Sequence, residues 1–194
     1  MVNIPAAAVV LAGGRGSRLG GIDKPGLHIG DRSLLDIAMD AVRDCPIVVV
    51  GPARQLPAGT IAAREHPVGG GPAAALAAGI AALPALPPGA VVAVLAADLP
   101  AIDAATIGRL TAALAAREID AADGAVLIDA EGRRQYLIGV WRLDRLQAAI
   151  ARRADWHERP LRRLLEPLRT VEIPSLEQES ADVDTPQDWR HWQG

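Results

Sequence analysis

A short apolar run that ends in a glycine-rich loop constrains the fold of this chain more than any other stretch. Residues 9–25 read V-V-L-A-G-G-R-G-S-R-L-G-G-I-D-K-P. Such a continuous apolar run is typical of a buried strand in a parallel sheet. Glycines let a backbone approach a ligand with no Cβ in the way, and successive N–H groups in such a loop bind anions. The stretch therefore predicts a buried strand followed by a phosphate-binding loop.

Lys24 carries the clearest chemical signal in this loop. It is the only lysine of the chain, in which every other basic side chain apart from histidine is arginine. A compact ammonium fits between phosphate oxygens in a way that a planar guanidinium does not reproduce. The alternative is an ordinary solvated loop. We expect Lys24 and Arg18 to neutralise phosphate charge.

The rest of the chain alternates short apolar runs with helical patterns, which indicates an α/β fold. We predict a three-layer α/β/α sandwich with a Rossmann-like, mostly parallel sheet, in a single domain over residues 1–194. We expect two halves within this domain, residues 1–100 and residues 101–194. The runs at 125–129 and 135–141 flank a turn, which predicts an antiparallel hairpin. The predicted strands are 6–11, 46–51, 60–63, 90–96, 125–129, 135–141 and 171–173.

Ligands of such sheets bind beyond the carboxyl ends of the strands. This rule selects the loop after Leu11, the turn at Gly51 and the turn at Asp98, together with a late acidic segment. Asp98 follows an apolar run and precedes Leu-Pro. A triphosphate needs Mg²⁺, which prefers one or two carboxylates plus phosphate oxygens and water. Asp98 is the expected magnesium ligand, and its alternative role is to cap the helix that follows.

The late acidic segment is Asp182-Val183-Asp184. Its two carboxylates point the same way in extended geometry and repel one another unless a cation lies near them. We expect Asp184 to bind the metal as well. The alternative is that one aspartate caps the last helix, which begins at Thr185-Pro186, while the other is solvated.

A second glycine-rich segment precedes Pro72. Residues 69–71 are all glycine, and Pro72 suits the first position of a helix. A helix N-terminus behind glycines can receive an anion or a base edge. The alternative is a plain junction between a loop and a helix.

The first loop is neither a Walker A sequence nor a dinucleotide-binding loop, because the required spacings are missing. Its pattern L-A-G-G-x-G-x-R-x-G-G-x-D-K resembles the signature of nucleotidyltransferases, and most of all that of the molybdenum cofactor guanylyltransferase family. The resemblance implies that the loop contacts the nucleotide through Leu11, Ala12, Gly13, Gly14 and Lys24. It also implies that Asp98 binds the metal.

Three further segments resemble the family with changes. Glu65 stands where the family has an aspartate, and Gly71-Pro72-Ala73 where it has Gly-Pro-Leu. Asp182-Val183-Asp184 replaces Asn-Val-Asn. The segment with Arg133 and Gln135 resembles the part that faces the acceptor. The resemblance thus implies nucleotide contacts at Glu65, Gly71 and Pro72, and acceptor contacts at Arg133, Gln135, Asp182 and Asp184. It implies that residues 1–100 are the nucleotide-binding half of the domain and residues 101–194 the acceptor-binding half.

The function implied by the resemblance is transfer of GMP from GTP to molybdenum-loaded molybdopterin, with Mg²⁺ as cofactor. Cytidylyl transfer and activation of a sugar phosphate are alternatives with the same chemistry. A third alternative is a non-catalytic protein that binds a nucleotide or delivers the pterin cofactor. The resemblance also implies molybdoenzymes or other cofactor-biosynthesis proteins as partners of this protein, besides GTP and molybdopterin.

Composition excludes several other classes of protein. The formal net charge of −3 gives no reason to expect a nucleic-acid partner. No apolar stretch reaches the ~18 residues of a membrane span. A single cysteine, Cys45, excludes a disulfide framework. Since residues 1–5 lack the features of a signal peptide, we expect the cytoplasm as the compartment.

Overall fold

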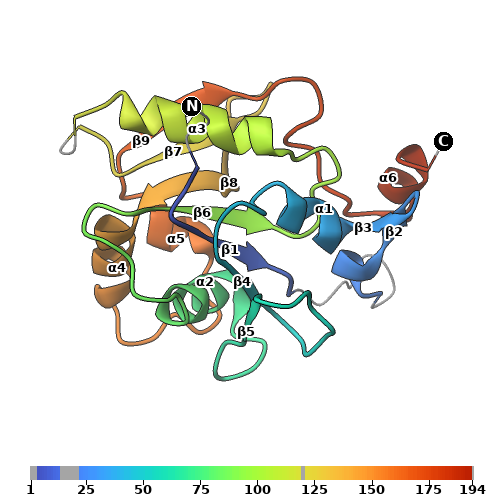
Figure 1. Ribbon diagram of the computed structural model, residues 1–194, viewed down its shortest axis with the longest axis horizontal. Coiled ribbons are helices and arrows are strands. Elements are labelled where there is room, and N and C mark those ends of the chain that lie inside the picture. The colour runs from blue at the N-terminus through green and yellow to red at the C-terminus, as the bar shows by residue number, and fades with distance from the viewer. Residues whose placement is uncertain (1–3, 14–21, 119–120, 194) are drawn as a thin grey trace.

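The computed structural model describes residues 4–13, 22–118 and 121–193. Within these ranges the main sheet has the strand order β5-β4-β1-β6-β8-β7-β9, and a small separate sheet pairs β2 with β3 (Figure 1). The strands are β1 (Ala7–Leu11), β2 (His28–Ile29), β3 (Arg32–Ser33), β4 (Ile47–Val50), β5 (Ile61–Ala63), β6 (Val91–Ala96), β7 (Gly124–Ile128), β8 (Arg134–Arg142) and β9 (Thr170–Pro174). The helices are the short 3₁₀ turn η2 (Lys24–Gly26), α1 (Leu34–Asp40), α2 (Gly71–Ala81), α3 (Ala104–Ala115), α4 (Leu143–Ala151), α5 (Leu161–Leu165) and α6 (Pro186–His191).

Strand β1 lies between β4 and β6 and is parallel to both. Leu11 at its end pairs with Val50 of β4 and with Ala96 of β6. Strand β8 runs antiparallel to β6 and β7, while β9 is again parallel to β7. The predicted mostly parallel sheet with an antiparallel hairpin is therefore confirmed. Because the sheet runs from β5 to β9, it joins the two predicted halves of the chain.

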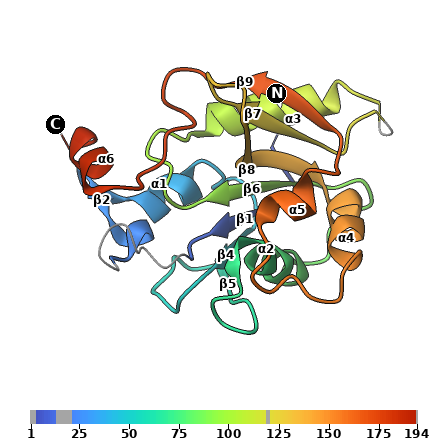
Figure 2. The same ribbon diagram turned by 180° about the vertical axis from the view of Figure 1, so that it is seen from behind.

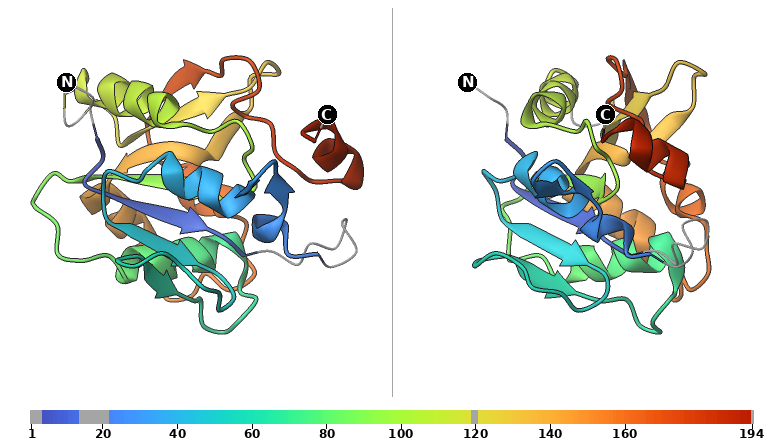
Figure 3. Two further views of the ribbon diagram at one scale, coloured as in Figure 1. Left: turned by 45° about the vertical axis from the view of Figure 1, so that its right-hand side comes forward. Right: turned by 90° about the vertical axis from the view of Figure 1, so that its right-hand side faces the viewer.

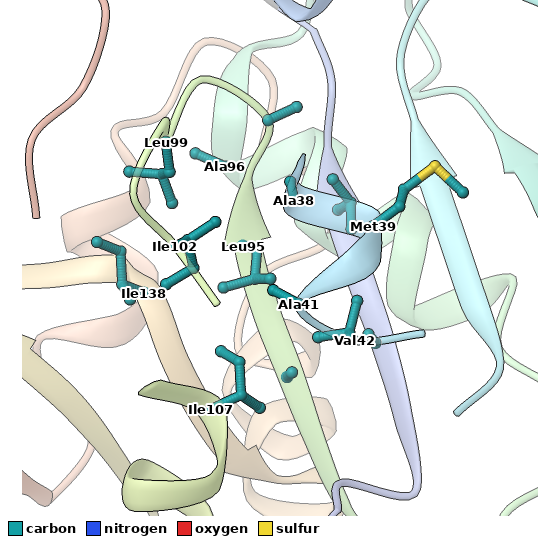
Figure 4. Close-up of a cluster of buried hydrophobic side chains, with 14 of the residues drawn as sticks. Ala38, Met39, Ala41, Val42, Leu95, Ala96, Leu99, Ile102, Ile107 and Ile138 are labelled. Atoms are coloured by element: carbon teal, nitrogen blue, oxygen red, sulfur yellow. The ribbon is translucent and has the colours of Figure 1, made fainter. Parts of the chain in front are cut away.

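Alternate residues of the strands point into two separate hydrophobic cores. One core packs α1 and α3 against one face of the sheet, and the other packs α2, α4 and α5 against the opposite face (Figures 1 and 2). In the first core, Ala38 of α1, Val42 just after this helix and Ile107 of α3 lie around Leu95 of β6 (Figure 4). This arrangement is the predicted three-layer α/β/α sandwich.

The helix starts follow local capping chemistry. The hydroxyl of Ser33 accepts a hydrogen bond from the Asp36 N–H, and Thr185 does the same for Asp188, so each forms a capping box. Asp103 caps α3, which therefore starts at Ala104. These polar caps satisfy N–H groups that have no partner inside the helix.

The small β2–β3 hairpin was not predicted from the sequence. It lies next to α6 at one end of the molecule, where Trp189 Nε1 donates to the His28 carbonyl at 3.0 Å (Figure 3). Among the described residues, no helix combines the length and apolar character that crossing a membrane requires.

Candidate active site

The carboxyl ends of β1, β4 and β6 meet at one edge of the sheet. Gly13 follows β1, Gly51 follows β4 and Asp98 lies two residues beyond β6. A Cβ on Gly51 would lie only 2.6 Å from the Ala12 carbonyl oxygen, so only glycine lets these two loops approach so closely. The loops thereby form the floor of a common site.

A pocket of about 950 Å³ opens above this edge. It brings together parts of the chain from Leu11 to Asp184. Among its walls are predicted site residues: Leu11, Gly13, Lys24, Glu65, Gly71, Pro72, Asp98, Gln135, Asp182 and Asp184. Its volume lies within the range of small-molecule sites.

Three carboxylates converge in this pocket. Asp98, Asp182 and Asp184 each offer an oxygen, and these oxygens lie within 4.8 Å of one another. A backbone hydrogen bond of 3.1 Å from the Val183 N–H to the Asp98 carbonyl joins the two segments. Val183 itself is fully buried. Burial of this valine anchors the extended segment and directs both flanking aspartates into the pocket.

Lys24 supplies positive charge to the three carboxylates. Its Nζ donates a hydrogen bond to Asp184 Oδ1 and lies 3.7 Å from Asp98 Oδ2. The Lys24 side chain is 18% exposed. Because η2, the turn after β6 and the segment before α6 all contribute, the cluster forms only in the folded chain.

The electrostatics of the cluster favour a cation. Burial raises the pKa of Asp98 above its usual value, Lys24 opposes this, and Asp182 and Asp184 raise the pKa further. The pKa of Asp182 is also raised, first by loss of hydration around its carboxylate and then by repulsion from Asp184. A positive charge beside these groups is the physical way to keep them ionised near neutrality.

The start of α2 forms another wall of the pocket. Gly71 has a φ of +84°, and Pro72 follows within the first turn of the helix. Glu65 Oε1 accepts a hydrogen bond of 2.9 Å from the Gly69 N–H, so this carboxylate holds the loop before the helix. From much later in the chain, the Glu158 N–H donates to the Gly70 carbonyl at 2.7 Å.

A second, smaller pocket of about 640 Å³ adjoins the first. Gln135, Ser180 and Asp182 line both pockets. Arg133 lines only the smaller one, where its guanidinium donates to Asp129 at 2.8 Å and to Glu131 at 3.1 Å. Arg133 and Gln135 therefore lie on one side of the cluster, and α2 lies on another.

Arg18 and Gly14 lie outside the described residues. Arg54 was not predicted from the sequence as a site residue. It follows β4 and contacts both Ala12 and Asp23. Its nearness to Gly51, a residue selected by the sheet-edge rule, was the available signal. The segment at Glu158–Pro160, which lines the large pocket but has no distinctive motif, was not predicted either.

Together, the sheet order and the charged pocket at its edge define an α/β nucleotidyltransferase fold. Residues 8–173 match the model of the MobA-like NTP transferase domain. The chain therefore belongs to this family of nucleotidyltransferases, which act on nucleoside triphosphates. No curated protein matches the sequence.

Solved structures with the same fold include several nucleotidyltransferases. Rv0371c from Mycobacterium tuberculosis is 22% identical, with 100% of this chain and 99% of that chain covered and a TM-score of 0.72. Molybdopterin-guanine dinucleotide biosynthesis protein A from Archaeoglobus fulgidus is 20% identical, with 96% of each chain covered and a TM-score of 0.68. The 2-C-methyl-D-erythritol 4-phosphate cytidylyltransferase from Thermus thermophilus is 18% identical, with 98% of each chain covered and a TM-score of 0.70.

Proposed function

We propose that this protein transfers GMP from GTP to molybdenum-loaded molybdopterin and releases pyrophosphate. The observation that carries the proposal is the convergence of Lys24 with Asp98, Asp182 and Asp184 in a pocket that also contains the start of α2. The pocket thus combines groups for a triphosphate, a metal and a base. The resemblance of the first loop to the guanylyltransferase signature supports GTP as the donor.

The carboxylate cluster fits a divalent cation. Its donors are hard oxygen atoms close enough together to share one ion, which is the chemistry that Mg²⁺ prefers. We propose that Asp98 and Asp184 hold Mg²⁺, which neutralises charge on the phosphates of the bound nucleotide. Asp182 lies where the two pockets meet, so we assign it to the acceptor side of the site.

The reaction itself needs charge neutralisation and alignment. A terminal phosphate oxygen of the acceptor forms a bond to the α-phosphorus of GTP, and the bond from that phosphorus to the bridging oxygen breaks. The electron pair leaves with pyrophosphate. Because the attacking phosphate is already anionic, no general base is required. Lys24 and Arg18 would stabilise the leaving pyrophosphate. To do so, Lys24 would exchange its carboxylate partners for phosphate oxygens.

The nucleotide would lie between the first loop and α2. We assign Leu11, Ala12 and Gly13 to the sugar and phosphates, with Gly14 continuing the same loop. We assign Gly71 and Pro72 to the base, because both line the pocket wall at the helix start, where Gly71 offers a backbone N–H and Pro72 an apolar ring. Glu65 acts there through its hydrogen bond to the loop at Gly69. Gly51 would contribute by letting the adjacent backbone approach closely.

The acceptor would occupy the smaller pocket. In this assignment the terminal phosphate of the acceptor would lie near Asp182 and point toward Asp98 in the larger pocket. Gln135 and Arg133 would contact the rest of the acceptor. Arg133 is already paired with Asp129 and Glu131, so its contact with an anion requires exchange of these partners. That exchange reduces its net contribution to affinity.

Cytidylyl transfer is the second candidate function. A cytidylyltransferase has a TM-score of 0.70 against this chain, compared with 0.68 for the guanine dinucleotide protein, so the backbone alone favours neither base. The test has two further outcomes. One is transfer to a sugar phosphate, and the other is a protein that binds a pterin cofactor and delivers it to a molybdoenzyme without catalysis.

The test is pyrophosphate release with a panel of nucleoside triphosphates, Mg²⁺ and molybdenum-loaded molybdopterin. We expect release with GTP only, and formation of the guanine dinucleotide by mass spectrometry. Release with CTP would identify a cytidylyltransferase. Release with a sugar 1-phosphate would change the acceptor, and binding of both substrates without release would establish the non-catalytic alternative.

A further inference from the structure

Arg54 connects two ends of the first loop that are far apart along the chain. Its Nη2 donates to the Ala12 carbonyl oxygen at 3.1 Å and to Asp23 Oδ1 at 3.1 Å. Its Nη1 lies 3.3 Å from Asp23 Oδ2. The planar fork of one arginine thus binds a backbone carbonyl and both oxygens of a carboxylate, which a lysine ammonium cannot do with the same geometry.

The two partners of Arg54 flank functional elements. Ala12 follows the end of β1, and Asp23 directly precedes Lys24 at the start of η2. Lys24 in turn contacts Asp184 and lies near Asp98. Arg54 thus binds Asp23, Asp23 is joined to Lys24 by the peptide bond, and the Lys24 ammonium contacts the carboxylate cluster.

We propose that Arg54 is a positioning residue for Lys24. By fastening Asp23 to the end of β1, it fixes where η2 begins and therefore where the ammonium of Lys24 lies. Arg54 is not among the described residues that line the large pocket, so it acts through Asp23 and Ala12 and not on a ligand. The positioning itself is a property of the protein alone, while its catalytic consequence depends on the proposed function.

A chance surface ion pair would not have these features. The Asp23 side chain is 61% exposed, and pairs with so exposed a partner usually contribute little. The Arg54 side chain, however, is only 15% exposed. Its third contact is to the backbone of Ala12, which is 1% exposed. The close approach permitted by Gly51 brings the loop of Arg54 against that backbone.

The experiment uses the fact that Lys24 is the only lysine of the chain. Its acetylation by an N-hydroxysuccinimide ester is followed by mass spectrometry at fixed pH and normalised to the rate in the unfolded protein. We expect Arg54→Ala to accelerate acetylation about fivefold, which corresponds to about 1 kcal/mol of lost restraint. Arg54→Lys should lie between this variant and the wild type.

The direction of the change separates positioning from simple electrostatics. Arg54→Ala also removes a positive charge near Lys24, and general electrostatics give this loss the opposite effect on the acetylation rate. Faster acetylation of Arg54→Ala therefore means that the ammonium has lost its restraint. In an Asp23→Ala background, Arg54→Ala should add little, because the connection is already broken. The matched control is Arg43→Ala, which removes an arginine paired with Asp40 elsewhere on the surface and should leave the rate unchanged.

An unchanged or slower rate in a folded Arg54→Ala variant would overturn the proposal. If that variant does not fold, the comparison of Asp23→Ala with wild type decides, since an unchanged rate there has the same meaning. Acetylation is measured without nucleotide, so this result is independent of the proposed function. In the pyrophosphate assay we expect Arg54→Ala to lower kcat about tenfold, at a melting temperature close to that of wild type.

Discussion

At the scale of single residues, the ammonium of Lys24 reduces repulsion among three carboxylates. Asp98 and Asp182 both have raised pKa values, so the fold holds them near one another at a cost in stability. Such a cost is typical of sites that bind a cation or catalyse a reaction. A bound cation would remove the repulsion that remains among the carboxylates of the unliganded protein. The free energy released in this way would increase the affinity of the site for the cation and its phosphate ligand.

Replacing Lys24 by alanine should therefore affect activity much more than folding. The variant loses the positive charge that we assign to the leaving pyrophosphate, and we expect pyrophosphate release to fall about 10²–10³-fold. The control is Lys24→Arg, which keeps the charge but not the compact ammonium and should recover only part of the rate. Turnover of GTP by Lys24→Ala near the wild-type rate would contradict the role assigned to this lysine.

Replacing Asp98 by asparagine should stabilise the metal-free protein at neutral pH. The folded-state pKa of Asp98 is raised, so ionised Asp98 destabilises the fold above that pKa and its protonated form does not. The melting temperature of Asp98→Asn should thus exceed that of wild type by a few degrees at pH 7. The difference should shrink as the pH falls through the raised pKa. Thermal denaturation at several pH values measures it.

Asp123→Asn is the control for this pH dependence because its shift has the opposite sign. Burial acts against ionisation of Asp123, but hydrogen bonds from Arg169 outweigh it and lower its pKa. This variant should be less stable than wild type at pH 7, with a difference that disappears at acid pH. Equal pH profiles for the two variants would contradict the electrostatic account of Asp98.

The sequence predicted most individual members of the cluster but not all of their contacts. Lys24 was predicted as the only lysine, in a glycine-rich loop, and Asp98 from its position after a predicted strand. Asp184 was predicted from its alternation with Asp182 before the last helix. The contact of Lys24 with two carboxylates could not be predicted, because it joins residues 160 positions apart through side-chain geometry. Arg54 was missed for the same reason: its nearness to Gly51 places it at the sheet edge, but its contacts with Ala12 and Asp23 form only in the folded chain.

At the scale of elements, Glu179 fastens the segment that carries Asp182 to α3. Its carboxylate accepts hydrogen bonds from Arg109 at 2.6 and 2.8 Å and from Thr106 at 2.5 Å. Burial acts against its ionisation, but these hydrogen bonds outweigh it and lower its pKa to about 2. The ion pair therefore stabilises the fold fully above the unfolded-state pKa and is lost between about pH 4.5 and pH 2.

Glu179→Gln should lower the free energy of unfolding by about 2 kcal/mol at pH 7, because charge-assisted bidentate pairs with little exposure are among the stronger ones. The loss should be much smaller at pH 3, as measured by urea denaturation at both pH values. The control is Glu166→Gln, whose partner Arg162 is 72% exposed, and no measurable change is expected there. A loss for Glu179→Gln that is equal at both pH values would exclude the charge as its cause.

Helix α2 depends on Gly79 for its close packing on the sheet. A Cβ at this position would lie 2.4 Å from Val9 Cγ1 and 2.8 Å from Val50 Cγ2. Both valines are fully buried and cannot move away easily. Gly79→Ala should therefore destabilise the protein by about 1–3 kcal/mol, although alanine has the higher helix propensity.

A double variant tests whether steric overlap is the cause. Val9→Ala removes the nearest methyl group, so Gly79→Ala should cost less in that background than in the wild type. The free energies of unfolding of the four proteins give the coupling. Purely additive losses would mean that the helix does not rest on Val9 in the way the structure describes.

Elements with a distinctive local pattern were predictable, whereas strands of two residues were not. The buried strands at 7–11, 47–50 and 91–96 have continuous apolar runs, and α6 has Thr185-Pro186 at its start. The β2–β3 hairpin consists of pairs of residues, too short for any periodicity to be read. Its position is determined by contacts such as the hydrogen bond from Trp189, which only the folded chain creates.

At the scale of the whole molecule, the order of the strands assembles the site. The central position of β1 places its loop between the ends of β4 and β6, so Gly51 and Asp98 lie on either side of it. The rule that ligands bind at such an edge predicted the location of the site from the sequence. The identity of the base could not be predicted in this way, because it depends on individual hydrogen bonds at the pocket wall.

Binding of the correct nucleotide should stabilise the entire fold, since only the folded state assembles this pocket from distant segments. At a ligand concentration of 100 times Kd, the gain is about 2.7 kcal/mol. In a domain of this size, that corresponds to a rise in melting temperature of about 5–10 °C.

We expect this rise with GTP and Mg²⁺, a smaller one with GTP and EDTA, and none with CTP and Mg²⁺. In Asp98→Asn the difference between Mg²⁺ and EDTA should disappear, because a proposed metal ligand is lost. An equal rise with CTP would contradict the assignment of the base, and no rise with either nucleotide would contradict the nucleotide site itself.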